Sequence, residues 1–277
     1  MDNPLPETPR VQTPAHMHSR IWLEEPEADN PFAARAAYCH GYDVYGDMLG
    51  RAGWADMIFL LFRGEAPSPL QAAALETLAV ALANPGPRDA SVNAAMCGGV
   101  GGSPAAASLM AALAVGAGSS GGSREIVLAM EAWSACGKDM QAWRNRWAET
   151  AAEPEAIGIW PRAEHPAGFD PHGASASTPV KQVLARLSEL DSHSRAAWLQ
   201  AHLSEMEKAA GHPLSLVGMA AAAFADLGFA PQEGEMLFLL LRLPGAAAHA
   251  LEQGGFGHKR FPFYRMELQD GPQGKRP

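Results

Sequence analysis

The chain has 277 residues, of which 47% are apolar, and this is enough for one large domain or two unequal ones with a substantial core. The formal net charge of −9 argues against nucleic-acid binding, because proteins that bind nucleic acids usually present a basic face. The three cysteines are scattered without a CxxC pair, which indicates reduced thiols in a soluble, cytoplasmic protein. The N-terminus lacks the apolar segment of a signal peptide, and the longest apolar runs are too short to span a membrane or are interrupted by Arg242 and Pro244.

The first part of the chain reads as an arm followed by helices. Residues 1–31 are polar and rich in proline, which predicts a disordered or extended segment. Beyond Trp54, apolar residues recur at helical spacing until Gly64, a typical helix stop. Ser68 and Pro69 then form the start signal of another helix, with the serine as N-cap and the proline at the first helical position.

Helical patterns continue along the rest of the chain, with one interruption. The Ala-rich stretch 103–115 predicts a helix suited to close packing, and residues 123–152 predict an amphipathic one. Residues 153–179 are irregular and rich in Gly, Pro and His, and helical patterns resume at Val180 and run to residue 253. Because β-branched runs are scarce throughout, the sequence predicts an all-α fold.

The stretch GAGSSGGSRE, residues 116–125, joins two of these helices and leaves three interpretations open. Ser119 and Ser120 would donate hydrogen bonds to a phosphate or a thioester oxygen at the N-terminus of the following helix. A plain Gly/Ser connector, with Ser123 capping the helix, is the structural alternative. A nucleotide-hydrolase phosphate loop is disfavoured because no Gly-Lys-Ser/Thr sequence follows. The third interpretation is an active-site loop that has lost a catalytic residue.

Several stretches together resemble blocks of the citrate synthase superfamily, in particular its short citryl-CoA lyase-like branch. They are GYDVYGDMLGRAGWADMIFLLFRGEAPSP (41–69), LAVGAGSSGGSREIVLAMEAW (113–133), AGFDPHGASASTPV (167–180), LSLVGMAAAAFADLGF (214–229) and LRLPGAAAHALEQ (241–253). The blocks stand in the order of the family and cover roughly residues 38–264. The resemblance implies an all-helical fold with a large and a smaller domain, and an active site between them that a homodimer completes.

On this resemblance we assign four regions to the chain. Residues 1–31 form the N-terminal arm, residues 32–150 the large-domain helices, residues 151–230 mostly small-domain helices with the active-site loop, and residues 231–277 a return to the large domain with a C-terminal arm. The family joins or splits an acyl-CoA and an oxo-acid. The resemblance therefore also implies an acyl-CoA and a small carboxylate as ligands, with no covalently bound cofactor.

The chain departs from the family at the residues that carry the chemistry. Ser120 stands where the family has its first catalytic histidine, Pro171 where it has the second, and Val217 where it has the aspartate that removes a proton. Val180 stands in place of a carboxylate-binding arginine, whereas Arg242 keeps a matching substrate-binding identity. Valine cannot accept a proton, and one acid–base group contributes about 10²–10⁴-fold to a rate. We therefore predict a divergent protein, weak or inactive in citrate synthesis, that binds a CoA thioester or small carboxylate.

The alternative is an active enzyme with a rebuilt site, either an acyltransferase that joins acyl-CoA to an oxo-acid or a lyase that cleaves citryl-CoA. His172, next to the lost histidine, would then act with Asp170 and Ser120. One segment carries Glu164, His165, Asp170 and His172. It is a weak candidate for a metal site because no helix or CxxC spacing fixes these ligands, so we expect no metal. A structural scaffold that binds no small molecule is a third hypothesis.

Arg242 and His249 of the last predicted helix join Ser119 as candidate substrate-binding residues. Arg242 lies in a strongly apolar run, and a buried arginine requires a partner, either a carboxylate ligand or an internal acid such as Glu235. His249 stands where the resemblance often places a histidine near the site, and a core histidine is the structural alternative. The predicted partners are a second copy of the chain and these small molecules, with neither nucleic acid nor a membrane.

Overall fold

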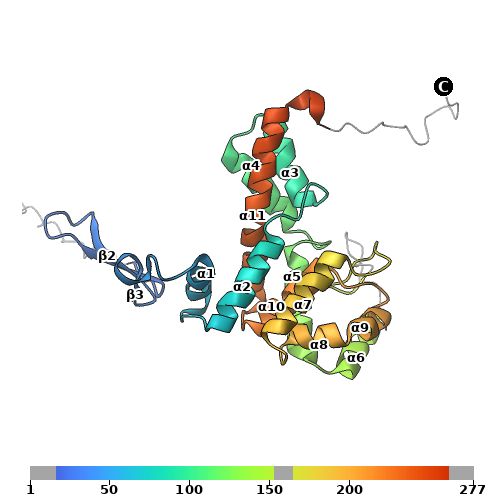
Figure 1. Ribbon diagram of the computed structural model, residues 1–277. Coiled ribbons are helices and arrows are strands. Elements are labelled where there is room, and N and C mark those ends of the chain that lie inside the picture. The colour runs from blue at the N-terminus through green and yellow to red at the C-terminus, as the bar shows by residue number, and fades with distance from the viewer. Residues whose placement is uncertain (1–16, 153–164, 262–277) are drawn as a thin grey trace, which may run out of the picture. The chain divides into compact units, whose positions relative to one another are not determined.

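The computed structural model describes residues 17–152 and 165–261 (Figure 1). The chain divides into two compact units, residues 1–66 and residues 67–277, and each is described by itself. The helical fold that the sequence predicts is confirmed, with the addition of a small three-stranded sheet in the first unit. Residues 1–16 of the predicted N-terminal arm and the predicted C-terminal arm beyond residue 261 lie outside the described residues.

The first unit combines an antiparallel sheet with helix α1. Its elements are β1 Trp22–Pro26, β2 Ala34–Cys39, β3 Tyr42–Asp43, the π-helical turn η1 Val44–Met48 and α1 Trp54–Arg63. His40 and Gly41 both have positive φ and form the tight turn between β2 and β3. Gly64 ends α1 in the left-handed conformation, which agrees with the stop that the sequence predicts there.

The sequence does not predict this sheet, and the reason lies in its strands. β1 is almost entirely exposed and β2 reads ARAAYC, so neither shows the alternation of apolar and polar residues that marks a half-buried strand. The strands form because their backbones pair, with Trp22 opposite Cys39 and Glu24 opposite Ala37. β1 falls within residues 1–31, the region for which an arm is predicted.

The second unit is built from helices. They are α2 Pro69–Leu82, α3 Ala90–Val100, α4 Ala105–Gly116, α5 Ser123–Cys136, α6 Met140–Ala152, α7 Thr178–Leu190, α8 Arg195–Ala201, α9 Leu203–Ala210, α10 Leu216–Asp226, α11 Pro231–Phe256 and the 3₁₀ turn η2 His258–Arg260. Ser68 accepts a hydrogen bond from the backbone N of Gln71 and so caps α2 as predicted. Asp89 and Ser215 cap α3 and α10 in the same way.

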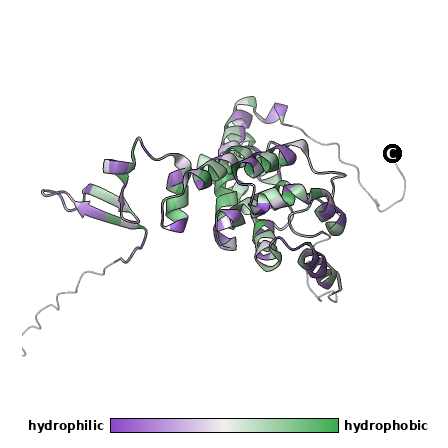
Figure 2. Cartoon of the chain, turned by 60° about the horizontal axis from the view of Figure 1, so that its bottom comes forward, coloured by the Kyte–Doolittle hydropathy of each residue, from purple (hydrophilic) through white to green (hydrophobic). Residues whose placement is uncertain are grey.

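Helix α11 is the central element of the second unit. α3 and α4 pack beside its C-terminal part, and α5 packs beside its N-terminal part (Figure 1). α10 is buried from Val217 to Phe224 and lies against α5. Hydrophobic residues, green in Figure 2, run along the helices of this unit. In the described parts of the chain, no helix combines the length and apolar character that crossing a membrane requires.

A Pro-Gly pair inside α11 joins this helix to the segment that follows α2. The helix continues through Pro244, and the backbone N of Gly245 donates a hydrogen bond to the Ala83 carbonyl at 2.7 Å. A Cβ on Gly245 would lie 2.5 Å from that oxygen, so only glycine fits here without a shift. The contact positions the segment between α2 and α3, which carries Asn84 and Asp89, along α11.

Candidate functional site

A buried carboxylate joins the two loops in which the sequence places the candidate catalytic residues. Glu125, in the first turn of α5, is only 2% exposed. Its Oε2 accepts a hydrogen bond from the backbone N of Gly121 at 2.6 Å, and its Oε1 accepts one from the backbone N of Gly168 at 2.8 Å. Gly121 directly follows the two candidate serines, and Gly168 precedes Asp170 and His172. Glu125 therefore holds both candidate loops.

The surroundings of Glu125 compensate for the burial of its carboxyl group. The N-terminal turn of a helix favours a negative charge, and the two backbone donors satisfy both carboxylate oxygens. Nε2 of His165 lies 3.4 Å from Oε1, with the His165 side chain only 7% exposed, and the His165 ring stands edge-on to that of His212. The sequence does not reveal Glu125 as a site residue. The sequence feature that could have indicated it is an acidic residue in the first turn of the predicted helix, three residues after Gly122.

A third segment, at the start of α10, packs against the loop that contains Gly168. Phe169 and Leu214 form an isolated antiparallel bridge, and the backbone N of Ser215 donates to the Gly168 carbonyl at 3.0 Å. The two backbones approach closely, because a Cβ on Gly168 would lie 2.8 Å from the Cα of Gly218. The tertiary structure thus brings together the three segments in which the resemblance places the two catalytic histidines and the aspartate.

The candidate catalytic residues lie on these segments, but Asp170 does not orient the ring of His172. The Asp170 carboxylate accepts a hydrogen bond from the backbone N of His172 at 2.9 Å, which stabilises the turn. The side chain of His172 is exposed, as are Ser119 and Ser120. Val217 is buried at the start of α10, and its side chain has no group that could exchange a proton. The catalytic roles of Ser120, Asp170 and His172 stay predictions.

Ser123 does not cap α5, which corrects the connector interpretation in that detail. Gly122 occupies the N-cap position and makes no side-chain capping bond. Ser123 lies one position inside the helix, fully buried, and its Oγ donates to Oε1 of Glu235 at 3.4 Å. This contact joins the start of α5 to α11.

Arg242 is buried in α11 and is paired with an internal acid. The acid is Asp89, the N-cap of α3, and not Glu235, the example that the sequence suggests. The guanidinium also lies 4.5 Å from the ring centroid of Phe238. Burial lowers the pKa of Arg242, and the Asp89 carboxylate opposes this shift. Asp89 is 153 positions away in the chain, so the spacing of the sequence does not reveal the pair.

His249 lies on the same helix as Arg242 and has other partners. Its Nε2 is 3.1 Å from Oδ1 of Asn84, and its Nδ1 is 3.5 Å from Glu252. Seven residues separate it from Arg242, which corresponds to about 10 Å along an α-helix. His249 thus contacts the segment that follows α2, and its role in substrate binding stays a prediction.

A cavity of about 980 Å³ lies between α6 and α9. Its lining consists of Arg144, Trp147, Ala148, Pro166, Ala201, His202, Ser204, Glu205, Lys208, Ala209, Ala210 and His212. Arg144 and Lys208 are cationic, Trp147 adds an aromatic face, and Arg144 pairs with Glu205 at 2.5 Å. The sequence does not reveal this cavity, because separate segments supply its lining and none of them carries a recognisable motif.

Aromatic contacts connect this cavity to the candidate loops. The ring of Trp147 stands edge-on to that of Phe169, with centroids 5.4 Å apart. Pro166 and His212 line the cavity, and the His212 ring contacts that of His165, the partner of Glu125. Residues 165–169 therefore contact both the cavity and the carboxylate that holds the serine loop.

The described residues contain no group of three or more His, Cys, Asp or Glu side chains arranged to hold a metal ion. Glu164, which the sequence groups with His165 as a weak metal candidate, lies outside the described residues.

Comparison with solved structures identifies the fold. The chain is similar to citryl-CoA lyase from Hydrogenobacter thermophilus, with a TM-score of 0.70 and 20% identity over 94% of this chain and 97% of that one. It is also similar to ATP citrate lyase from Methanothrix soehngenii in complex with citrate and coenzyme A, with a TM-score of 0.69 and 18% identity over 99% of this chain and 48% of that one. The D541A mutant of Methanosaeta concilii ATP citrate lyase, in complex with (3S)-citryl-CoA, gives a TM-score of 0.68 and 18% identity over 96% and 44%.

These likenesses confirm the citrate synthase-like, mostly helical fold that the resemblance predicts. The chain spans nearly the whole citryl-CoA lyase but only about half the length of either ATP citrate lyase. No protein-family model matches the sequence, and neither does any curated protein.

Proposed function

We propose that this chain is a divergent relative of the citryl-CoA lyases that binds a CoA thioester and has little or no activity in citrate synthesis. The observation that carries the proposal is the cavity between α6 and α9, which combines cationic and aromatic side chains beside residues 165–169. The loss of the base supports the second half of the proposal, since Val217 is buried where the resemblance expects an aspartate.

The chemistry of CoA suits this cavity. CoA carries phosphate groups and an adenine ring at one end and its thioester at the other. Lys208 and Arg144 offer charge-assisted hydrogen bonds to phosphate, and Trp147 offers a face for stacking. Two of the structurally similar proteins hold coenzyme A or citryl-CoA, which supports the choice of ligand.

Lys208→Ala should weaken the binding of CoA by about ten-fold, because one charge-assisted hydrogen bond to phosphate is lost. Isothermal titration of the wild-type protein and the variant with CoA and acetyl-CoA measures this. Lys181→Ala, at the exposed start of α7, is the matched control and should bind like the wild type. Wild-type protein that binds neither ligand, or an equal loss in both variants, contradicts the proposed site.

An active enzyme with a rebuilt site is the alternative, and one observation favours it: Glu125 holds the loop of Ser120 beside the loop of Asp170 and His172. Incubation with acetyl-CoA or propionyl-CoA plus oxaloacetate, and separately with citryl-CoA, followed by mass spectrometry, separates the two functions. Product above the control without protein, lost in His172→Ala, supports the enzyme. Absence of product from folded protein that binds CoA supports the non-catalytic relative.

We also propose that the chain acts as a cytoplasmic homodimer that buries α4. Residues 90–122 contain no charged side chain, yet Met110 is 61% exposed and Val115 is 45% exposed. Exposed apolar side chains on an uncharged helix suit a surface that another protein covers. A second copy of the chain is the occupant that the resemblance suggests.

A further inference from the structure

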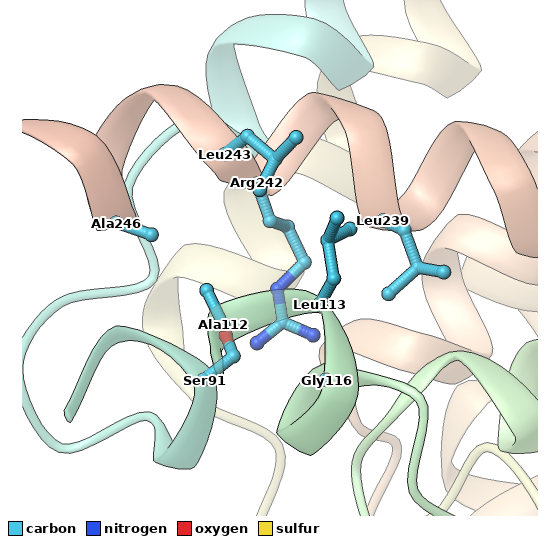
Figure 3. Close-up of a pocket in the computed structure, with 8 residues that line it drawn as sticks. All are labelled: Ser91, Ala112, Leu113, Gly116, Leu239, Arg242, Leu243 and Ala246. Atoms are coloured by element: carbon cyan, nitrogen blue, oxygen red, sulfur yellow. The ribbon is translucent and has the colours of Figure 1, made fainter. Parts of the chain in front are cut away.

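The buried guanidinium of Arg242 lies in a site that is almost closed. Arg242 is 6% exposed, and its head reaches from α11 toward Ser91 and Gly116 (Figure 3). The cavity there has a volume of about 10 Å³ and is lined by these residues together with Ala112, Leu113, Leu239, Leu243 and Ala246. That is about the space one water molecule needs, so a dicarboxylate or tricarboxylate does not fit beside the guanidinium.

The chain itself supplies the carboxylate of this site. Oδ2 of Asp89 pairs with the guanidinium of Arg242. Oδ1 of Asp89 accepts hydrogen bonds from the backbone N of Ser91 at 3.0 Å and from its Oγ at 2.5 Å. Both carboxylate oxygens are therefore used, one to neutralise the arginine and one to cap α3. The Asp89 side chain is 22% exposed, so it lies at the solvent edge of the site while Arg242 lies inside.

The guanidinium retains unused hydrogen-bonding capacity. Nε of Arg242 is buried and has no hydrogen-bond partner among the described residues. An arginine offers five N–H donors in a planar fork that matches a carboxylate. Arg242 thus has the chemistry of a carboxylate receptor, although its principal ligand is a side chain of the same molecule.

We propose that Asp89 is an internal ligand of the Arg242 site: a free carboxylate reaches Arg242 only when the Asp89 carboxylate leaves, and a monocarboxylate of the size of acetate takes its place. Asp89 then competes with external carboxylates and selects against those larger than itself. The inference is independent of the proposed binding of CoA, because it concerns the contact of α3 with α11 and not the cavity between α6 and α9.

Chemical rescue of Asp89→Ser tests the competition. Serine retains the N-cap of α3, removes the carboxylate and leaves space beside Arg242. Its thermal midpoint should fall by about 5–10 °C because a buried charge loses its partner. Sodium acetate, compared with sodium chloride at equal ionic strength, should then raise that midpoint in a saturable manner. The midpoint of the wild-type protein should be the same in both salts.

The double variant Asp89→Ser with Arg242→Met is the control, because it keeps the space but removes the receptor. Its midpoint should not respond to acetate beyond its response to chloride. Asp89→Asn, which keeps both the cap and the size of the side chain, serves if the serine variant does not fold, and it should show a smaller acetate effect. The proposal is wrong if acetate changes the thermal midpoints of Asp89→Ser, the double variant and the wild type equally. It is also wrong if citrate raises the midpoint of the wild type in a saturable manner and this response is lost in Arg242→Met.

Discussion

Hydrogen-bond donors from two loops converge on the buried carboxyl group of Glu125. Gly121 and Gly168 donate to different oxygens of the carboxylate, and His165 lies beside one of them. A buried carboxylate with such partners acts as a positioning residue for both loops, although the sequence does not single it out as a site residue. Its contact with Gly168 spans 43 positions of the chain, so no local pattern predicts it.

Glu125→Gln should lower the free energy of unfolding by about 1–3 kcal/mol, because the amide group has one oxygen where the two backbone donors use two. Chemical denaturation measures this loss. Hydrogen exchange should also quicken at Gly121 or Gly168, depending on which N–H then faces the side-chain NH₂ group. Glu131→Gln, on the exposed face of the same helix, is the control and should change stability by less than about 0.5 kcal/mol. Unchanged exchange at both glycines would show that Glu125 does not hold the loops.

Some features of the site can be predicted from the sequence and others cannot, depending on whether they involve contacts between distant segments. The residues Ser120, Pro171 and Val217 are read directly from the sequence, which also shows that the side chain at position 217 cannot accept a proton. The partner of Arg242 does not follow, because both Glu235 and Asp89 are acids and only the packing of α3 on α11 selects between them. The cavity between α6 and α9 arises in the same way from segments that are distant in sequence.

At the scale of elements, helices are predictable where their ends carry local signals. Ser68 with Pro69 starts α2, and Gly64 ends α1, because capping and left-handed glycine are properties of a few adjacent residues. The sheet of β1, β2 and β3 is not predictable in this way, since it depends on pairing between strands whose side chains are mostly exposed. Pro244 would suggest a break, yet α11 continues past it.

Gly245→Ala should destabilise the protein by about 1–3 kcal/mol, because its Cβ would overlap the Ala83 carbonyl and Asn84 and force α11 away from the end of α2. Thermal or denaturant unfolding measures the change. Gly255→Ala lies on the same helix in open space, and there alanine should stabilise by up to about 1 kcal/mol. Two substitutions of the same chemistry should therefore have opposite signs. A neutral Gly245→Ala would mean that the contact of α11 with the segment after α2 is loose.

At the scale of the whole molecule, the uncharged surface of α3 and α4 allows a prediction about the proposed dimer. Met110→Glu should convert the proposed dimer to monomers, because it places a charge in an apolar interface while leaving the core of the chain intact. Sedimentation velocity measures the mass of wild type and variant. Gln182→Glu on the exposed face of α7 introduces the same charge and should leave the assembly unchanged. A wild-type monomer at all accessible concentrations contradicts the dimer.

The sequence by itself determined the helical class, several helix ends and the likeness to citryl-CoA lyases. These properties reside in adjacent residues or in the order of short motifs, and folding does not alter them. Only the tertiary structure decided that Glu125 holds the two candidate loops, that Asp89 pairs with Arg242 and that a cavity with cationic and aromatic side chains adjoins residues 165–169. Those properties depend on which distant side chains share a buried volume, and a chain with many acids and bases allows many pairings until packing selects one.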